Sequence, residues 1–152
     1  MRSETIFKFT ARWRTRYGSH QAREIAISSC FDNPGQWPFT LKRYDIFVNS
    51  FDYSEDKQEY ETVRISAETF EEIKRYIENN AALKACPENI ENNVMDGSME
   101  SFYFACNSYT KRTGGMSVLG SGHYGSANST VCSAIEGIGA ILAKSGIELG
   151  LY

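Results

Sequence analysis

Four segments with the two-residue periodicity of β-strands precede the first helical pattern, and this order limits the fold more than any other feature of the sequence. The clearest segment runs from Phe7 to Arg14, where apolar side chains alternate with Lys, Thr and Arg. Further strands are expected over 23–29, 44–51 and 60–65, and the third of these four is apolar on both faces, as a strand inside a sheet would be. A parallel α/β domain would alternate strands with helices from its start, so the sequence predicts a mainly antiparallel sheet.

A helix is expected directly after the fourth strand. Ser66 is a typical N-cap residue, and the helix should end near Asn79. Its apolar side chains, Phe70, Ile73 and Ile77, recur at helical spacing. One face of this helix should therefore pack on the sheet.

The rest of the chain is predicted to add strands and one more helix. The expected elements are an irregular segment over 79–93, a strand over 99–106, a loop over 107–115, a short strand over 116–119, a helix over 130–144 and a last short strand over 147–152. The predicted fold class is α+β, a mainly antiparallel sheet with two helices packed on one face in the order β-β-β-β-α-β-β-α. At 152 residues, one α+β domain covering residues 1–152 is the simplest organisation.

Charge is distributed unevenly along the sequence. Residues 1–30 carry six basic and two acidic side chains, whereas residues 31–100 carry seven basic and fifteen acidic ones. The whole chain has a formal net charge of −3. This distribution predicts a polarised surface, which bears on the choice of partner more than on the fold.

The four cysteines predict a reduced protein without a metal site or cofactor. No two of them have the C-x-x-C spacing of a zinc or redox site, and the two histidines lack metal-ligand spacing. The sequence opens on a strand-like alternation instead of a secretory leader, and no apolar run is long enough to cross a membrane. A cytoplasmic location is expected.

A glycine- and serine-rich loop precedes the last predicted helix and is the first candidate ligand site. Its residues match G-x-G-x-x-G, and backbone amides at a helix N-terminus can hold a phosphate. A dinucleotide-binding domain is excluded, because too little chain follows the motif. The alternatives are a phosphate cradle or a plain loop between strand and helix. The candidate ligand-binding residues are Gly120, Ser121, Gly122, His123, Tyr124, Gly125, Ser126 and Ser129.

An enzymatic reading of this loop depends on one histidine and one cysteine. His123 could act as an acid or base, and Cys132 near the start of the helix would favour a thiolate. Nothing in the sequence brings the two together. A surface histidine and a core cysteine explain them more simply, so a hydrolase or transferase that uses His123 is the least favoured function.

The first hairpin and an aromatic loop form the second candidate site. Basic side chains alternate along the first strand, and Arg and aromatic residues dominate binding hot spots. Such a stripe could also track phosphates, or simply keep an edge strand soluble. Nucleic acid is the less favoured partner because the chain as a whole is acidic. The candidate partner-binding residues are Arg12, Arg14, Arg16, Tyr17 and Trp37.

Together these features predict a small non-enzymatic binding protein. The chain is typical in composition of prokaryotic or phage-encoded inhibitors that act by occupying a partner protein. The alternative is a protein that sequesters a phosphate-containing ligand, such as a nucleotide, in the glycine loop. Gly137 and Gly139 would suit a close helix contact between two copies of the chain, so a homo-oligomer is a further hypothesis.

Overall fold

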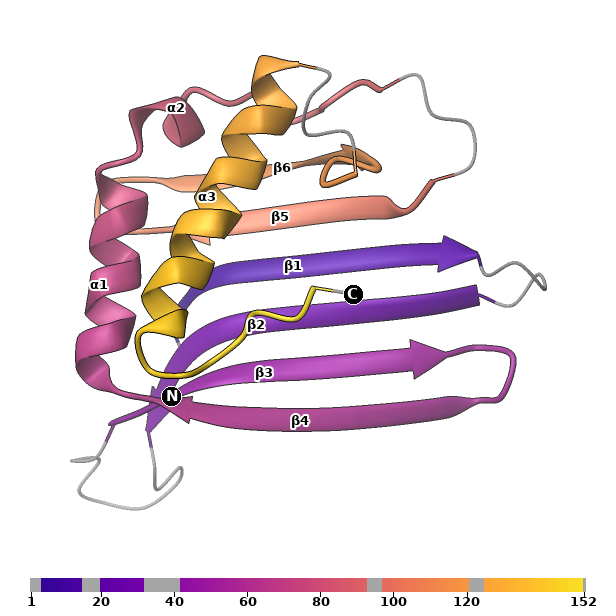
Figure 1. Ribbon diagram of the computed structural model, residues 1–152, viewed down its shortest axis with the longest axis horizontal. Coiled ribbons are helices and arrows are strands. Elements are labelled where there is room, and N and C mark those ends of the chain that lie inside the picture. The colour runs from indigo at the N-terminus through magenta and orange to yellow at the C-terminus, as the bar shows by residue number, and fades with distance from the viewer. Residues whose placement is uncertain (1–3, 15–19, 32–41, 93–96, 121–124, 152) are drawn as a thin grey trace.

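The computed structural model describes residues 4–14, 20–31, 42–92, 97–120 and 125–151. Six strands form one antiparallel sheet in the order β4-β3-β2-β1-β5-β6. The strands are β1 (Glu4–Arg14), β2 (His20–Phe31), β3 (Lys42–Asp52), β4 (Lys57–Ile65), β5 (Met99–Ala105) and β6 (Thr110–Met116). The helices α1 (Ala67–Glu78), α2 (Ala81–Lys84) and α3 (Ser126–Ala143) lie over one face of this sheet (Figure 1). The predicted fold class is confirmed.

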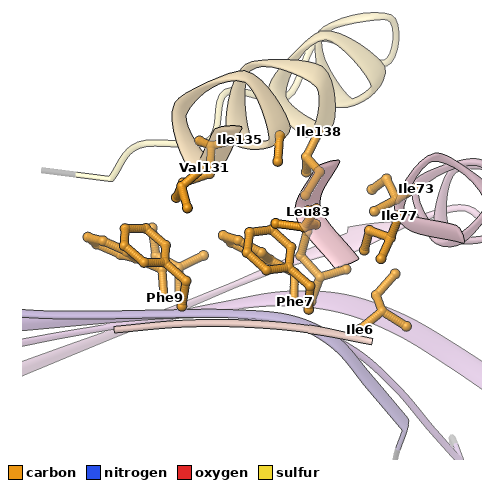
Figure 2. Close-up of a cluster of buried hydrophobic side chains, with 14 of the residues drawn as sticks. Ile6, Phe7, Phe9, Ile73, Ile77, Leu83, Val131, Ile135 and Ile138 are labelled. Atoms are coloured by element: carbon orange, nitrogen blue, oxygen red, sulfur yellow. The ribbon is translucent and has the colours of Figure 1, made fainter. Parts of the chain in front are cut away.

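The core lies between the helices and the middle of the sheet. Phe7 and Phe9 of β1 are fully buried, and Figure 2 shows both rings pointing from the sheet toward α3. The β1–β2 register shifts between Thr5 and Phe7, so Ile6 is an extra residue in the strand. This bulge lets Ile6 and Phe7 both face the helices, with Ile6 beneath the apolar side chains of α1 (Figure 2).

The helix α1 has the bounds and the buried stripe that the sequence predicts. The Ser66 side chain caps it by accepting a hydrogen bond from the Thr69 amide at 3.0 Å. Phe70, Ile73 and Ile77 are at most 1% exposed, because their spacing places all three on the side that faces the sheet.

The prediction of a loop over 107–115 is wrong, because β6 occupies most of it. Its sequence shows no apolar alternation, and it is an edge strand whose one neighbour among the described strands is β5. Its two glycines also leave room for a second chain segment: the Ile90 amide donates to the Gly114 carbonyl at 2.8 Å, and a Cβ at Gly115 would collide with the Ile90 carbonyl. The short strand expected over 116–119 is a turn after Met116.

The last helix begins four residues before the predicted start at Thr130. Gly125 is its N-cap, without a side-chain hydrogen bond. Asn128 is therefore no cap: it is 3% exposed, and its Nδ2 donates to the Val118 carbonyl at 3.4 Å. The Asn128 side chain ties the helix to the segment after β6.

Two shorter features also differ from the prediction. The short helix α2 lies within the segment expected to be irregular, and Leu83 on it is fully buried. The segment 147–151 is not a strand but runs back over β2 (Figure 1), where the Arg23 guanidinium donates to the Gly150 carbonyl at 2.9 Å. Its alternating apolar side chains pack half-buried against the core. Periodicity alone did not reveal that this extended segment has no neighbouring strand to pair with.

The two glycines of α3 differ in their surroundings, which predicts opposite effects for the same substitution. A Cβ at Gly137 would collide with the ring of Tyr76 on α1, whose hydroxyl donates to the Ser133 carbonyl at 3.1 Å. A Cβ at Gly139 would meet nothing within 4 Å. Gly137 therefore serves a helix contact within the chain.

We expect Gly139→Ala to raise the free energy of unfolding by about 0.5–1 kcal/mol, the gain in helix propensity. Gly137→Ala should lower it by about 1–2 kcal/mol, because the displaced Tyr76 loses its packing and its hydrogen bond. Urea unfolding of the two variants beside the wild type measures both values. Equal stabilisation by both substitutions would contradict the close α1–α3 contact.

Candidate functional site

One face of the sheet has no described helix or tail over it. Side chains alternate along each strand, so the neighbours of the buried Phe7, Phe9, Ile25 and Ile27 point to the opposite side. We refer to that side as the open face. It includes Lys8, Arg12 and Arg14 on β1, Ala22, Glu24 and Ala26 on β2, Phe47, Asn49 and Phe51 on β3, Gln58 and Tyr60 on β4, Met99 and Tyr103 on β5 and Arg112 on β6.

Large apolar side chains are exposed on this face. Within the described part of the chain, the large hydrophobic residues with the greatest exposure are Tyr60 at 63%, Met99 at 55% and Tyr53 at 50%. Tyr53 follows β3, and its ring centroid lies 4.3 Å from that of Phe51. The ring of Tyr60 lies 5.7 Å from that of Phe47. The exposed tyrosines thus belong to two aromatic pairs at the β3–β4 side of the open face.

Basic side chains follow β1 beside these rings. Arg12 is exposed and has no hydrogen-bond or ion-pair partner among the described residues. Arg14 lies 3.0 Å from the Nε2 atom of His20, and the guanidinium of Arg112 lies 4.7 Å above the ring centroid of Tyr103. Lys8 pairs at 3.7 Å with Glu24, and both side chains remain more than one-third exposed. Charge on β1 is therefore available to a ligand.

Two shallow hollows adjoin at Arg12 and Tyr53, which line both of them. One, of about 300 Å³, runs across β2 and β3 and is also lined by Glu24, Asn49 and Phe51. The other, of about 370 Å³, also includes His20 and Gln21. Apolar rings and hydrogen-bonding groups converge around one exposed guanidinium, which is an arrangement suited to binding.

A further hollow of about 300 Å³ lies on the helix-covered side of the sheet, beyond the ends of the helices. Its polar groups bond mainly to one another: Arg23 to Ser50 at 3.0 Å and Gln21 to Asp52 at 3.3 Å. Hydrogen bonds from Ser54, its side chain above all, hold the pKa of Asp52 below its usual value. These mutual contacts make this hollow the weaker candidate.

The structure places only part of the predicted partner-binding set. Arg12 and Arg14 lie together on the open face, whereas Arg16, Tyr17 and Trp37 lie outside the described residues. The aromatic residues of the open face were not among the predicted site residues. Their signal was present in the third strand, where Phe47 and Phe51 make its second face apolar. That pattern predicted a strand inside the sheet, and β3 does lie between β2 and β4. Its second apolar face is nevertheless part of the open face.

The glycine loop is described only at its two ends. Gly120 is the last residue of a turn, Gly125 is the N-cap of α3, and Ser126 and Ser129 are exposed in the first turn of the helix. Ser121, Gly122, His123 and Tyr124 lie outside the described residues. The Ser129 amide donates to the Gly125 carbonyl at 3.0 Å, so this amide is already used within the helix and cannot hold a phosphate.

The surroundings of Cys132 support the simpler of its two interpretations, a partly buried cysteine without a reactive thiolate. Because α3 begins at Ser126, this cysteine lies in the second turn, behind the first-turn amides that favour a thiolate. Burial raises the pKa of the Cys132 thiol, and the negative charges of Glu136 and Glu100 raise it further. All four cysteines are free.

A buried carboxylate anchors the chain before the glycine loop. Glu100 of β5 is 2% exposed, and its two oxygens accept hydrogen bonds from the Leu119 amide at 2.9 Å and the Ser98 hydroxyl at 2.7 Å. The alternation along the strand could have revealed it, because every second residue points to the same side and Glu100 is therefore on the side of the buried Phe102 and Phe104. Both oxygens accept a hydrogen bond within the fold, which suits a structural role.

Comparison with known proteins adds no family to this picture. No protein-family model matches the sequence, and a search of curated proteins also found no match. Within the described residues, no helix has the length and apolar character to span a bilayer, and no group of three or more His, Cys, Asp and Glu side chains is placed to hold a metal ion. The function must therefore be argued from the open face.

Proposed function

We propose that the protein is a non-enzymatic binding protein that acts as an antagonist by occupying a partner macromolecule with its open face. The observation that carries this proposal is that the exposed Tyr53, Tyr60 and Met99 share the open face with Arg12. Of these, Met99 is the pairing partner of Arg12, and Tyr53 lines a hollow with it. Tyr, Met and Arg are the residue types enriched in the centres of binding surfaces.

The physical cost of this arrangement supports a binding role. Apolar groups in water are unfavourable, and a contiguous exposed apolar patch commonly marks an interaction site. The paired rings of Phe47 and Tyr60, and of Phe51 and Tyr53, are also held in place before any partner arrives. Pre-organised side chains lose less conformational entropy on binding, so more of the contact energy remains as affinity.

Photocrosslinking in the source cells tests this proposal. A photoreactive phenylalanine analogue in place of Tyr60 should yield covalent adducts, and Arg12→Glu in the same chain should reduce them severalfold. The control is the same analogue in place of Glu136, which is exposed on α3 and should yield few adducts. Equal adduct formation at both positions, or none at position 60, would refute a binding role for the open face.

A further inference from the structure

We infer that the partner of the open face is a single-stranded nucleic acid, with its phosphates along β1 and its bases stacked on the aromatic rings. This inference rests on the proposed function and names the partner of the same face. It depends on two rows of side chains on the open face. The basic row lies on β1, the aromatic row lies on β3 and β4, and the small side chains Ala22 and Ala26 of β2 lie between them.

Charge separates between the two sides of the sheet. The chain has 16 basic and 19 acidic side chains, yet on the open face of the described strands basic residues outnumber acidic ones three to one. The basic ones are Lys8, Arg12, Arg14, Arg43, Arg64 and Arg112, and the acidic ones are Glu24 and Asp45. The acidic net charge, which argued against nucleic acid at the level of sequence, therefore belongs to the remainder of the molecule.

Three of the six basic residues on the open face have no carboxylate partner among the described residues. Arg43 and Arg64 lie 2.6 and 3.8 Å from Asp45. By contrast, Arg12, Arg14 and Arg112 make no ion pair with a carboxylate in the described part of the chain. Guanidinium groups bind phosphate through several hydrogen bonds at once, so three uncompensated ones favour a polyanion.

The register creates a shallow trough between the charges and the rings. On β2, Ala22 pairs with Arg12 on one side and Phe51 on the other, and Ala26 likewise lies between Lys8 and Phe47. Adjacent strands are about 4.8 Å apart, so the basic row and the aromatic row are separated by about 10 Å with only methyl groups between them at these positions. Glu24, between the two alanines, is partly neutralised by Lys8.

A nucleic acid strand fits both rows at once. Each nucleotide carries one phosphate and one flat base, and bases stack on exposed aromatic side chains without regard to sequence. Tyr60 and Tyr53 are the most exposed rings on the aromatic side, and Tyr103 offers another beneath Arg112 on the far side of β1. An acidic polypeptide would supply the charge but no regular series of flat groups. A duplex hides its bases from a flat sheet, so the strand should be single.

Fluorescence anisotropy with labelled single-stranded RNA and DNA of about ten nucleotides tests the inference at about 50 mM salt. We expect binding that weakens with salt, an affinity loss of about tenfold or more for Arg12→Glu, and a similar loss for Tyr60→Ala. The matched control is Arg75→Glu, which makes the same charge change at an exposed position of α1. It should change the affinity less than about twofold, since distant charges are screened.

Four results of the anisotropy titrations would overturn the inference, and two results of other measurements would do so as well. The four are no detectable binding, equal affinity for a duplex of the same length, equal losses for Arg12→Glu and Arg75→Glu, and unchanged affinity of Tyr60→Ala. Displacement of the labelled strand by polyglutamate at equal charge concentration would assign the face to an acidic protein instead. In the photocrosslinking experiment, adducts at position 60 that contain only protein would also contradict the nucleic-acid inference. The proposed binding role would then still hold.

Discussion

Replacing Phe7 by alanine should lower the free energy of unfolding by about 3–5 kcal/mol, the cost of emptying a fully buried aromatic site. Phe7 is 0% exposed, and its ring centroid lies 5.4 Å from that of Phe104 on the neighbouring strand. The pair lies beneath α3 at the centre of the sheet, so surrounding side chains cannot collapse into the space without moving the helix. Urea unfolding followed by circular dichroism measures the change.

The control for this prediction is Phe47→Ala, the same chemical change on the open face. Phe47 is only partly buried and contacts Tyr60 across the strand pair. We expect it to cost about 1 kcal/mol, because the removed ring is already partly in water. If both substitutions cost the same, Phe47 would be as buried as Phe7, and the open face would be covered in the folded protein.

Replacing Glu100 by alanine should lower the free energy of unfolding by about 2–3 kcal/mol, since the Leu119 amide and the Ser98 hydroxyl would lose their acceptors in a buried place. Glu100→Gln keeps an acceptor for the amide and should cost about half as much. Thermal unfolding gives the stability. Hydrogen exchange at the Leu119 amide should accelerate strongly in the alanine variant and much less in the glutamine variant.

The Glu100 variants also separate structure from binding. Glu100 lies on the covered side of the sheet, so the affinity of the open face for its partner should stay within about twofold of the wild type while the protein is folded. A large change in affinity with an unchanged fold would show that the two sides of the sheet are coupled. Unchanged stability in Glu100→Ala would contradict the two hydrogen bonds.

Local periodicity predicted the elements in which one face is buried and the other is exposed. The first strand and α1 have a buried face and an exposed face, so their sequences alternate at the expected spacing. The edge strand β6 has no such contrast and was missed. The predicted start of α3 was too late because Asn128 is a residue type that commonly caps helices. Its actual hydrogen-bond partner is the Val118 carbonyl, which local sequence does not reveal.

The candidate site was predictable in its charge and not in its aromatic part. Arg12 and Arg14 stand out because basic residues alternate along one strand. Phe47 and Tyr60 come from other strands, and only the pairing register shows that they share a face with Arg12. Register depends on contacts between distant segments, which no single stretch of sequence contains.

The position of β1 has a consequence for how the chain folds during synthesis. Of the six described strands, β1 leaves the ribosome first although it is an inner strand of the sheet, and its second neighbour, β5, follows only after β2, β3, β4 and α1. Until Met99–Ala105 emerges, one edge of β1 remains without a partner, and the rings that will contact Phe7 and Phe9 have not yet been made. The β1–β4 meander can form from local hairpins, but its apolar face is not fully covered until the second half of the chain has been synthesised. Translation speed through the residues before β5 therefore sets how long this unfinished sheet is exposed to other nascent chains.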